Sequence, residues 1–288
     1  MYRLIWVKSF FIIITVLMLS GCYMLNRYIY TDKELDEHFK NKSLKPIYKD
    51  TRFLNHHLHY VVMSKNDSLP LLLLIHGAPG AWYGYLNLME DSLLLDHFKI
   101  ISVDRLGYGK SDYGSEVLSV QMQALAIKQV MEEENHTHKQ VYLLGRSYGA
   151  PIAAWLAINY PQEIKKLLMV SPVIDPDKEK FFWFSKLGRW PLVQWFLPKL
   201  LNVATDEKFS HADQMRIMLP KWKHLYTPTD VLVGENDQIA DTANYSFAKK
   251  NISNSNARFI LVKNSGHLVT REHPKLIEDL LLDKKTEN

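Results

Sequence analysis

Residues 141–149, which read VYLLGRSYG, decide the expected fold. The apolar run before Gly145 predicts a buried strand, and the pattern G-x-S-x-G that follows predicts a tight turn into a helix. Glycines flank Ser147 because side chains two residues away on either side would collide in so sharp a turn. Free backbone N–H groups at the helix start also favour negative charge near Ser147. This stretch therefore predicts an activated serine; a plain turn serine is the alternative.

Apolar runs of this kind recur along the chain and alternate with helix-like stretches. An extended segment is expected at 53–63, and buried strands are expected at 69–75, 99–103, 140–144, 164–173, 230–233 and 258–262. Helices are expected at 81–95, 117–134, 148–160, 241–251 and 272–282. Strands that alternate with helices need crossover connections, which produce a mostly parallel sheet covered on both faces. The sequence predicts the α/β class.

One interval, residues 174–228, breaks this alternation. It contains four of the seven tryptophans, Trp183, Trp190, Trp195 and Trp222. It is too long for a plain connection and too apolar for a disordered one. We therefore expect a helical cap inserted between two parts of one core, residues 47–173 and 229–288. The cap aromatics could line an apolar pocket, pack the cap onto the core or contact a bilayer, and the sequence leaves these three readings open.

A serine hydroxyl is a weak nucleophile, so Ser147 needs a base and a group that orients the base. Asp237 follows a short strand-like run 90 residues after Ser147, and His267 follows the next such run 30 residues later. In this hypothesis His267 takes the proton from Ser147, while Asp237 holds the imidazole in one tautomer. We expect activity to fall in mild acid as the histidine is protonated.

Four motifs in the same chain order resemble those of the α/β-hydrolase superfamily, over roughly residues 50–285. Besides the serine turn these are HGAPG at 76–80, DRLGYGKSD at 104–112, and Gly266-His267 followed by Glu272 and Pro274. The resemblance implies an α/β-hydrolase fold with a mostly parallel central sheet. It also implies that the backbone N–H groups of Ala78 and Tyr148 bind the oxyanion, and that His76 is structural. Asp104, Arg105 and Asp112 are assigned to loop structure.

Other acids compete with Asp237 for the orienting role. Some relatives carry this acid after the strand that precedes the cap, where Asp175 stands, and Glu235 or Asp241 are further candidates. The ten remaining histidines form no pair with metal spacing on a helix, so no metal or cofactor is expected.

A serine nucleophile with an oxyanion hole indicates acyl transfer to water, and the leading hypothesis is hydrolysis of a small or lipid-like carboxylic ester. Relatives that open epoxides or displace halide use an aspartate where Ser147 stands. A second hypothesis is an aminopeptidase similar to proline iminopeptidases, since HGAPG is one residue from their HGGPG. Against it, their G-G-S-W-G differs from the serine turn here, and only Asp175, Asp177 and Glu179 are available to bind an amino group. A binding lipoprotein without turnover is the third.

The first 46 residues predict a signal peptide and a lipid anchor. Residues 1–21 combine Arg3 and Lys8 with a 10-residue apolar run, which is typical of a signal peptide. The sequence LSGC at 19–22 resembles the lipobox of bacterial lipoproteins, which implies acylation of Cys22, the single cysteine. An ordinary membrane anchor with an incidental cysteine is the alternative. Residues 22–46 are polar and predict a tether. The expected location is the bacterial cell envelope, and Tyr23 at the position after Cys22 allows the outer membrane.

The charge balance argues against a nucleic-acid partner. The formal net charge is +4, and removal of residues 1–21 leaves 33 basic and 31 acidic residues. No stripe of lysine and arginine interleaved with aromatic residues is present, so the chain lacks the electrostatic pattern of a nucleic-acid surface.

Overall fold

The computed structural model describes residues 30–135, 140–181 and 185–284. Cys22, the expected signal peptide and Trp183 lie outside these ranges. The chain divides into two units, residues 1–45 and 46–288. In the first unit, part of the expected tether is the helix α2 (Asp32–Phe39), which corrects that prediction. The helix begins with a capping box, because Glu34 and Thr31 each accept a hydrogen bond from the other's backbone N–H.

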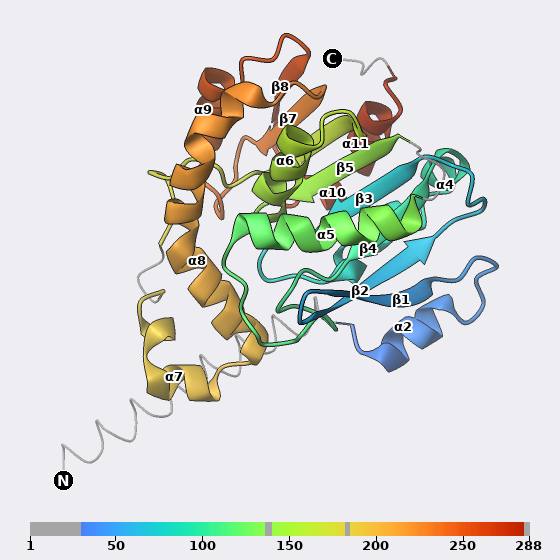
Figure 1. The fold of residues 1–288 in the computed structure, drawn as a ribbon, viewed down its shortest axis with the longest axis horizontal. Helices are drawn as coiled ribbons and strands as arrows, with labels where there is room; N and C mark the ends of the chain where they lie inside the picture. The colour runs from blue at the N-terminus through green and yellow to red at the C-terminus, as the bar shows by residue number, and fades with distance from the viewer. Residues whose placement is uncertain (1–29, 136–139, 182–184, 285–288) are drawn as a thin grey trace. The chain divides into compact units, whose positions relative to one another are not determined.

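An eight-stranded sheet forms the centre of the second unit (Figure 1). Its order is β1-β2-β4-β3-β5-β6-β7-β8; β2 is antiparallel to β1 and β4, and all other neighbours are parallel. The strands are β1 (Ile47–Phe53), β2 (His56–Met63), β3 (Leu71–Ile75), β4 (Lys99–Val103), β5 (Val141–Arg146), β6 (Ile164–Val170), β7 (Thr229–Gly234) and β8 (Ala257–Val262). The predicted α/β class is confirmed. The expected extended segment at 53–63 contains the turn at Leu54 and the second strand, β2, of a hairpin formed with β1.

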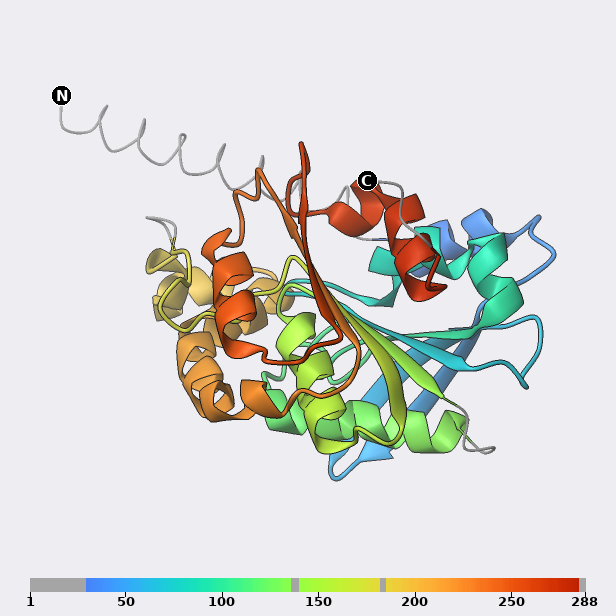
Figure 2. The same ribbon diagram turned by 90° about the horizontal axis from the view of Figure 1, so that it is seen from above.

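Helices cover both faces of this sheet, with α5, α6 and α9 on one side and α4, α10 and α11 on the other (Figure 2). Their bounds are η1 (Trp82–Tyr85), α3 (Leu86–Met89), α4 (Ser92–His97), α5 (Val120–Glu134), α6 (Gly149–Asn159), α9 (Ala243–Asn251), α10 (Val269–Glu272) and α11 (Pro274–Leu281). The single helix expected at 81–95 is divided into η1, α3 and α4. A new helix begins there because the Asp91 side chain accepts a hydrogen bond from the Leu94 N–H.

The interval between β6 and β7 is helical where the structure describes it. It contains η2 (Leu187–Arg189), α7 (Pro191–Phe196), α8 (Lys199–Met218) and η3 (Leu219–His224). Trp222 is fully buried, whereas Trp190, Trp195 and Phe196 are 61%, 79% and 65% exposed. Of these four aromatic residues of the cap, Trp222 packs inside and the other three face outward.

The strand order determines where loops converge. β3 pairs with β4 on one side and with β5 on the other, and Ile75 at the end of β3 lies opposite Gly145 of β5. Connections from neighbouring strands that leave in opposite directions open a crevice at the carboxyl edge of a parallel sheet. The loop at 76–80 and Ser147 therefore lie at the same edge.

Candidate active site

Ser147 lies on a strained turn between β5 and α6. Its φ of +54° is in the left-handed region, which side chains other than glycine rarely adopt. A Cβ on Gly145 would collide with the carbonyl oxygen of Gly149, and a Cβ on Gly149 would collide with the carbonyl oxygen of Ile75. The two glycines are thus required by space, as the sequence predicts, and they allow the serine to stand beside the end of β3.

Asp237 and His267 form a hydrogen-bonded pair at the same edge of the sheet. His267 Nδ1 donates to Asp237 Oδ2 at 2.7 Å, and both side chains are almost entirely buried. The second carboxylate oxygen of Asp237 accepts the N–H groups of Ile239 and Ala240, each at 2.9 Å. Because Nδ1 carries the proton, Nε2 keeps a lone pair and is the nitrogen available to act as a base.

The loops that carry Ser147 and His267 meet at the end of β6. The Ser147 N–H donates to the carbonyl of Val170 at 2.9 Å, and the next residue, Ser171, donates through Oγ to the carbonyl of His267 at 2.9 Å. Within the described residues no hydrogen bond joins the Ser147 hydroxyl to the His267 ring. Catalytic hydrogen bonds are commonly long without substrate and shorten in the reactive complex.

Glu272 holds the loop that presents His267. Its carboxylate accepts hydrogen bonds from Ser265 Oγ at 2.5 Å and from the Gly266 N–H at 2.8 Å. The bond from Ser265 lowers the pKa of Glu272, so this side chain stays charged. The glutamate that the sequence places after His267 therefore stabilises the loop.

Two backbone donors lie close to Ser147 without a protein acceptor. Over the described residues, the N–H groups of Ala78 and Tyr148 donate no hydrogen bond. The loop of Ala78 presses against the serine, because a Cβ on Gly77 would lie 2.9 Å from Ser147 Cβ and 3.5 Å from its Oγ. Ala78 also packs with Tyr148, Val173 and Ala240. An oxyanion hole requires N–H groups of this kind, free of protein acceptors, beside a nucleophile.

Comparison with known proteins identifies the fold. A family model described as the alpha/beta hydrolase fold matches residues 70–205. The crystal structure of a membrane phospholipase A superposes with a TM-score of 0.67 and 20% identity, covering 96% of this chain and 97% of that one. The chain has the α/β-hydrolase fold. The fold predicted from the four motifs is confirmed.

Curated relatives resemble this chain over a shorter stretch. Epoxide hydrolase 4 of Mus musculus is 26% identical over 46% of this chain, and the proline iminopeptidase of Lactobacillus crispatus is 26% identical over 48% of it. These matches span 40% and 46% of the relatives' own lengths, so the chain spans less than half of each.

The acids that compete with Asp237 accept hydrogen bonds from other groups. The carboxylate of Asp175 accepts the N–H of Asp177, that of Glu235 accepts the N–H of Asn264, and that of Asp241 accepts the N–H of Ala243. Only Asp237 contacts His267 among these four. The described residues also contain no group of three or more His, Cys, Asp or Glu arranged to hold a metal.

Three polar residues on α8 were not anticipated from the sequence. Glu207 binds Arg105, Lys208 binds Glu179, and His211 stacks on Tyr148 with ring centroids 4.2 Å apart. Glu207 and His211 belong to the buried helix face that also carries Val203 and Met215. This spacing of four residues is the signal that could have found them.

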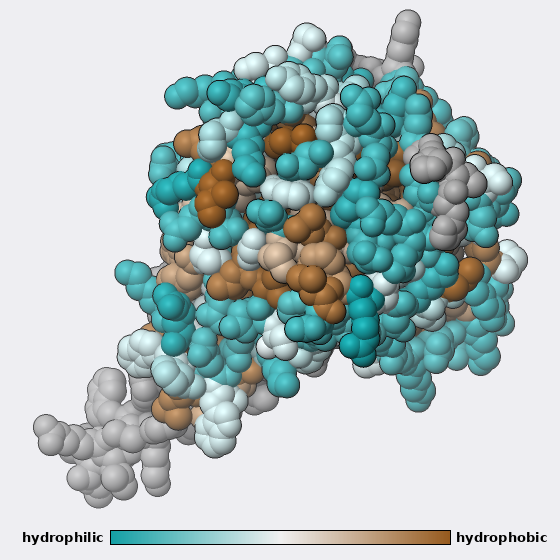
Figure 3. All heavy atoms as spheres, viewed as in Figure 1, coloured by the Kyte–Doolittle hydropathy of each residue, from teal (hydrophilic) through white to brown (hydrophobic). Residues whose placement is uncertain are grey.

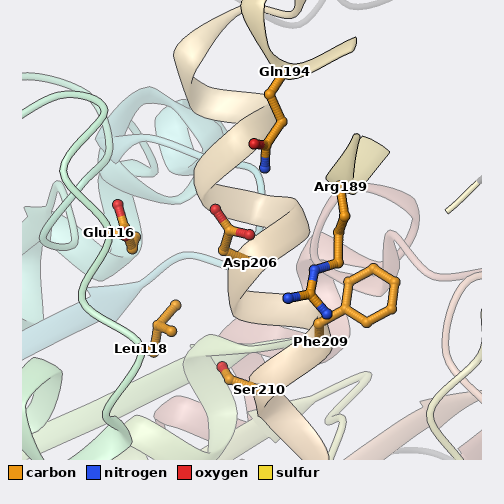
Figure 4. A pocket seen from close by; sticks show the side chains of 7 residues that line it. All are labelled: Glu116, Leu118, Arg189, Gln194, Asp206, Phe209 and Ser210. Atoms are coloured by element: carbon orange, nitrogen blue, oxygen red, sulfur yellow. The ribbon is translucent and has the colours of Figure 1, made fainter. Parts of the chain in front are cut away.

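A cavity of about 450 Å³ lies on another side of α8 (Figure 4). It is lined by Glu116, Leu118, Arg189, Gln194, Asp206, Phe209 and Ser210. Burial and the neighbouring Glu116 raise the pKa of Asp206. None of the lining residues is Ser147, Asp237 or His267, so this cavity is separate from the candidate active site.

Proposed function

We propose that the chain is a serine hydrolase that cleaves carboxylic esters through an acyl-enzyme. Ser147 Oγ attacks the ester carbonyl while His267 Nε2 takes its proton and then returns it to the leaving alcohol. The N–H groups of Ala78 and Tyr148 bind the oxyanion. Water, activated by His267, then releases the acid. The observation that carries this proposal is a strained Ser147 beside two free N–H donors, at the edge where Asp237 orients His267.

Other chemistries of related proteins fit these residues less well. Similarity to epoxide hydrolases covers 46% of the chain at 26% identity and 77% at 20% identity, but the relatives that open epoxides use an aspartate in place of Ser147. For an aminopeptidase, the cap would need free carboxylates to bind the substrate's amino group. Asp175 accepts the N–H of Asp177, Asp177 is largely exposed beside Arg216, and Glu179 is paired with Lys208. An ester substrate makes no such demand.

The test is covalent labelling combined with substrate comparison. A fluorophosphonate should label Ser147, detected by peptide mass spectrometry, and Ser147→Ala should lower ester turnover by about 10⁴-fold or more while thermal unfolding stays unchanged. Ser68→Ala, on an exposed loop, is the matched control and should keep full activity.

The outcomes separate the alternatives. Faster cleavage of proline p-nitroanilide than of p-nitrophenyl esters would favour the aminopeptidase. Absence of labelling in folded protein would favour a binding lipoprotein.

We propose further that acylation of Cys22 anchors the enzyme to a membrane of the bacterial envelope. In residues 30–135, 140–181 and 185–284 no helix has the length and apolar character to cross a bilayer. The exposed Trp190, Trp195 and Phe196 support contact with a lipid surface, because aromatic side chains favour the membrane interface. Apolar side chains reach the surface where α7 lies (Figure 3). Lys186, Arg189 and Lys199 flank this helix and suit anionic lipids.

A further inference from the structure

We propose that helix α8 of the cap positions both oxyanion donors, with Glu207 acting on Ala78 and Lys208 acting on Tyr148. The inference rests on the proposed function and concerns the same site. Glu207 and Lys208 touch neither Ser147 nor His267, so both are positioning residues. Each reaches a donor through one intermediate side chain, Arg105 for Glu207 and Glu179 for Lys208.

The first connection ends on the peptide group that carries the Ala78 N–H. The carbonyl of Gly77 belongs to the same planar peptide unit, so its direction fixes the direction of that N–H. This carbonyl accepts two hydrogen bonds, from His76 Nδ1 at 2.7 Å and from Arg105 Nη2 at 3.1 Å. His76 is held in this tautomer because its Nε2 accepts the Arg105 N–H at 3.0 Å. Hydrogen bonds at the carbonyl also polarise the N–H of the same peptide and make it a better donor.

Arg105 depends in turn on the cap. Its guanidinium is completely buried and binds Glu207 with two hydrogen bonds, of 2.5 Å from Nη1 and 2.9 Å from Nη2. Tyr108 donates to the same carboxylate at 2.7 Å. Arg105 Nη2 therefore donates to both Glu207 and the Gly77 carbonyl. Loss of the carboxylate would leave an uncompensated buried cation, and Arg105 would have to reorient away from Gly77.

The second connection ends on Tyr148. Its hydroxyl donates to Glu179 Oε1 at 2.8 Å, and Lys208 Nζ donates to the same oxygen at 2.8 Å. His211, one turn further along α8, packs against the Tyr148 ring and binds the carbonyl of Val173 through Nε2 at 2.9 Å. The side chain of Tyr148 is thus held at both its ring and its hydroxyl, which restrains the backbone that carries the second donor.

These contacts join the position of the cap to the shape of the oxyanion hole. A displacement of α8 would remove Glu207 from Arg105 and Lys208 from Glu179 at once, because the two residues are adjacent on the helix. Both donors would then lose the support that α8 gives them, although His76 would still bind the Gly77 carbonyl. Stabilisation of the transition state therefore requires the cap in its packed position.

The experiment uses the full chain with Glu207→Gln, which keeps the size of the side chain and removes its charge. We expect kcat for a p-nitrophenyl ester to fall about 10- to 100-fold, less than the 10²- to 10³-fold typical of deleting an oxyanion donor. KM should change by less than about threefold, because the transition state loses the interaction and the bound ester does not. Affinity for a trifluoromethyl ketone, which forms a tetrahedral adduct with the serine, should fall by the same factor as kcat.

Two further variants keep the test informative. Tyr108→Phe retains the ring and removes one hydrogen bond to Glu207, so kcat should fall about threefold in the same direction. This variant decides the question where Glu207→Gln does not fold. Asp213→Asn lies on the exposed face of α8 and should leave kcat unchanged.

The outcomes separate this inference from the proposed function. A wild-type chain without esterase activity, or a Ser147→Ala variant that keeps it, would refute the proposed function. An active wild type whose Glu207→Gln and Tyr108→Phe variants lose only thermal stability, with kcat and ketone affinity intact per labelled serine, would overturn the inference alone.

Discussion

The serine turn and the cap contribute to the same candidate site in different ways. Around Ser147 the constraints come from nearby in the chain, since Gly145 and Gly149 are two residues away and their missing side chains leave room for the turn. In the cap the constraints come from far away, since Glu207 binds a guanidinium 102 residues distant. The comparison teaches that the nucleophile is encoded locally, whereas the support of its oxyanion hole is assembled only by folding.

The two regions also differ in what they expose. Ser147 and Tyr148 are 5% and 7% exposed, and the loops around them pack tightly. The cap has a buried polar face on α8 and outward aromatics on α7, such as Trp195 at 79%. The loops around Ser147 therefore form only the candidate active site. The cap has an inner face that packs toward this site and an outer face that is exposed and could contact a membrane.

The largest expected effect tests whether the orienting acid belongs to the core or to the cap interval. Asp237→Asn should lower kcat about 10³- to 10⁴-fold, because an amide donates to His267 Nδ1 and imposes the wrong tautomer. Asp175→Asn, the matched control, should change kcat by less than about threefold, since the carboxylate of Asp175 accepts the N–H of Asp177 and does not contact His267. Steady-state ester kinetics measure both. The reverse ranking would move the acid to the start of the cap.

An intermediate effect compares one buried histidine from each region. Burial lowers the pKa of His76 in the core loop and of His211 on α8, which favours the neutral form of both in the folded chain. The unfolded chain binds protons at these positions below about pH 6.5, and the free energy of unfolding should fall by about 1 kcal/mol per histidine per pH unit below that. Urea denaturation at pH 7.5 and 5.5 measures this loss.

Single histidine variants test which residue causes the loss of unfolding free energy in acid. His211→Asn should reduce the pH dependence by the share of one histidine, and exposed His224→Asn should leave it unchanged. An unaltered pH dependence in His211→Asn would contradict a neutral His211 in the folded cap.

The smallest effect on catalysis is expected at the outer face of the cap. Trp195→Ser should change hydrolysis of a soluble short-chain ester less than about twofold, because the Trp195 side chain is 79% exposed. Partition of the Trp195→Ser variant onto anionic phospholipid vesicles should be about tenfold weaker than that of the wild type. The reason is that insertion of about 50 Å² of indole contributes about 1.3 kcal/mol. Vesicle sedimentation measures this partition.

The control is Tyr226→Ser, which removes another exposed aromatic side chain beyond the far end of α8 and should leave binding unchanged. Equal loss in both variants, or none in Trp195→Ser, would contradict a membrane role for α7.

Much of the core was predictable because its signals are short-range. The buried strand at 99–103 agrees with β4, and the expected helix at 148–160 differs from α6 by one residue at each end. Other expectations failed where a polar cap outweighed composition. Asp91 starts a new helix inside the expected 81–95, and Thr31 with Glu34 starts one in the expected tether.

The sequence by itself determined the α/β alternation and the turn at Ser147, because periodicity and steric collisions act between residues close in the chain. It also placed Asp237 and His267 after strands, where parallel pairing brings them to one edge. Only the tertiary structure decided that Asp237 rather than Asp175 meets His267, and that Glu207 meets Arg105. Those choices depend on how loops and a cap helix pack together, and a buried charge selects its partner by distance in space, which residue order does not encode.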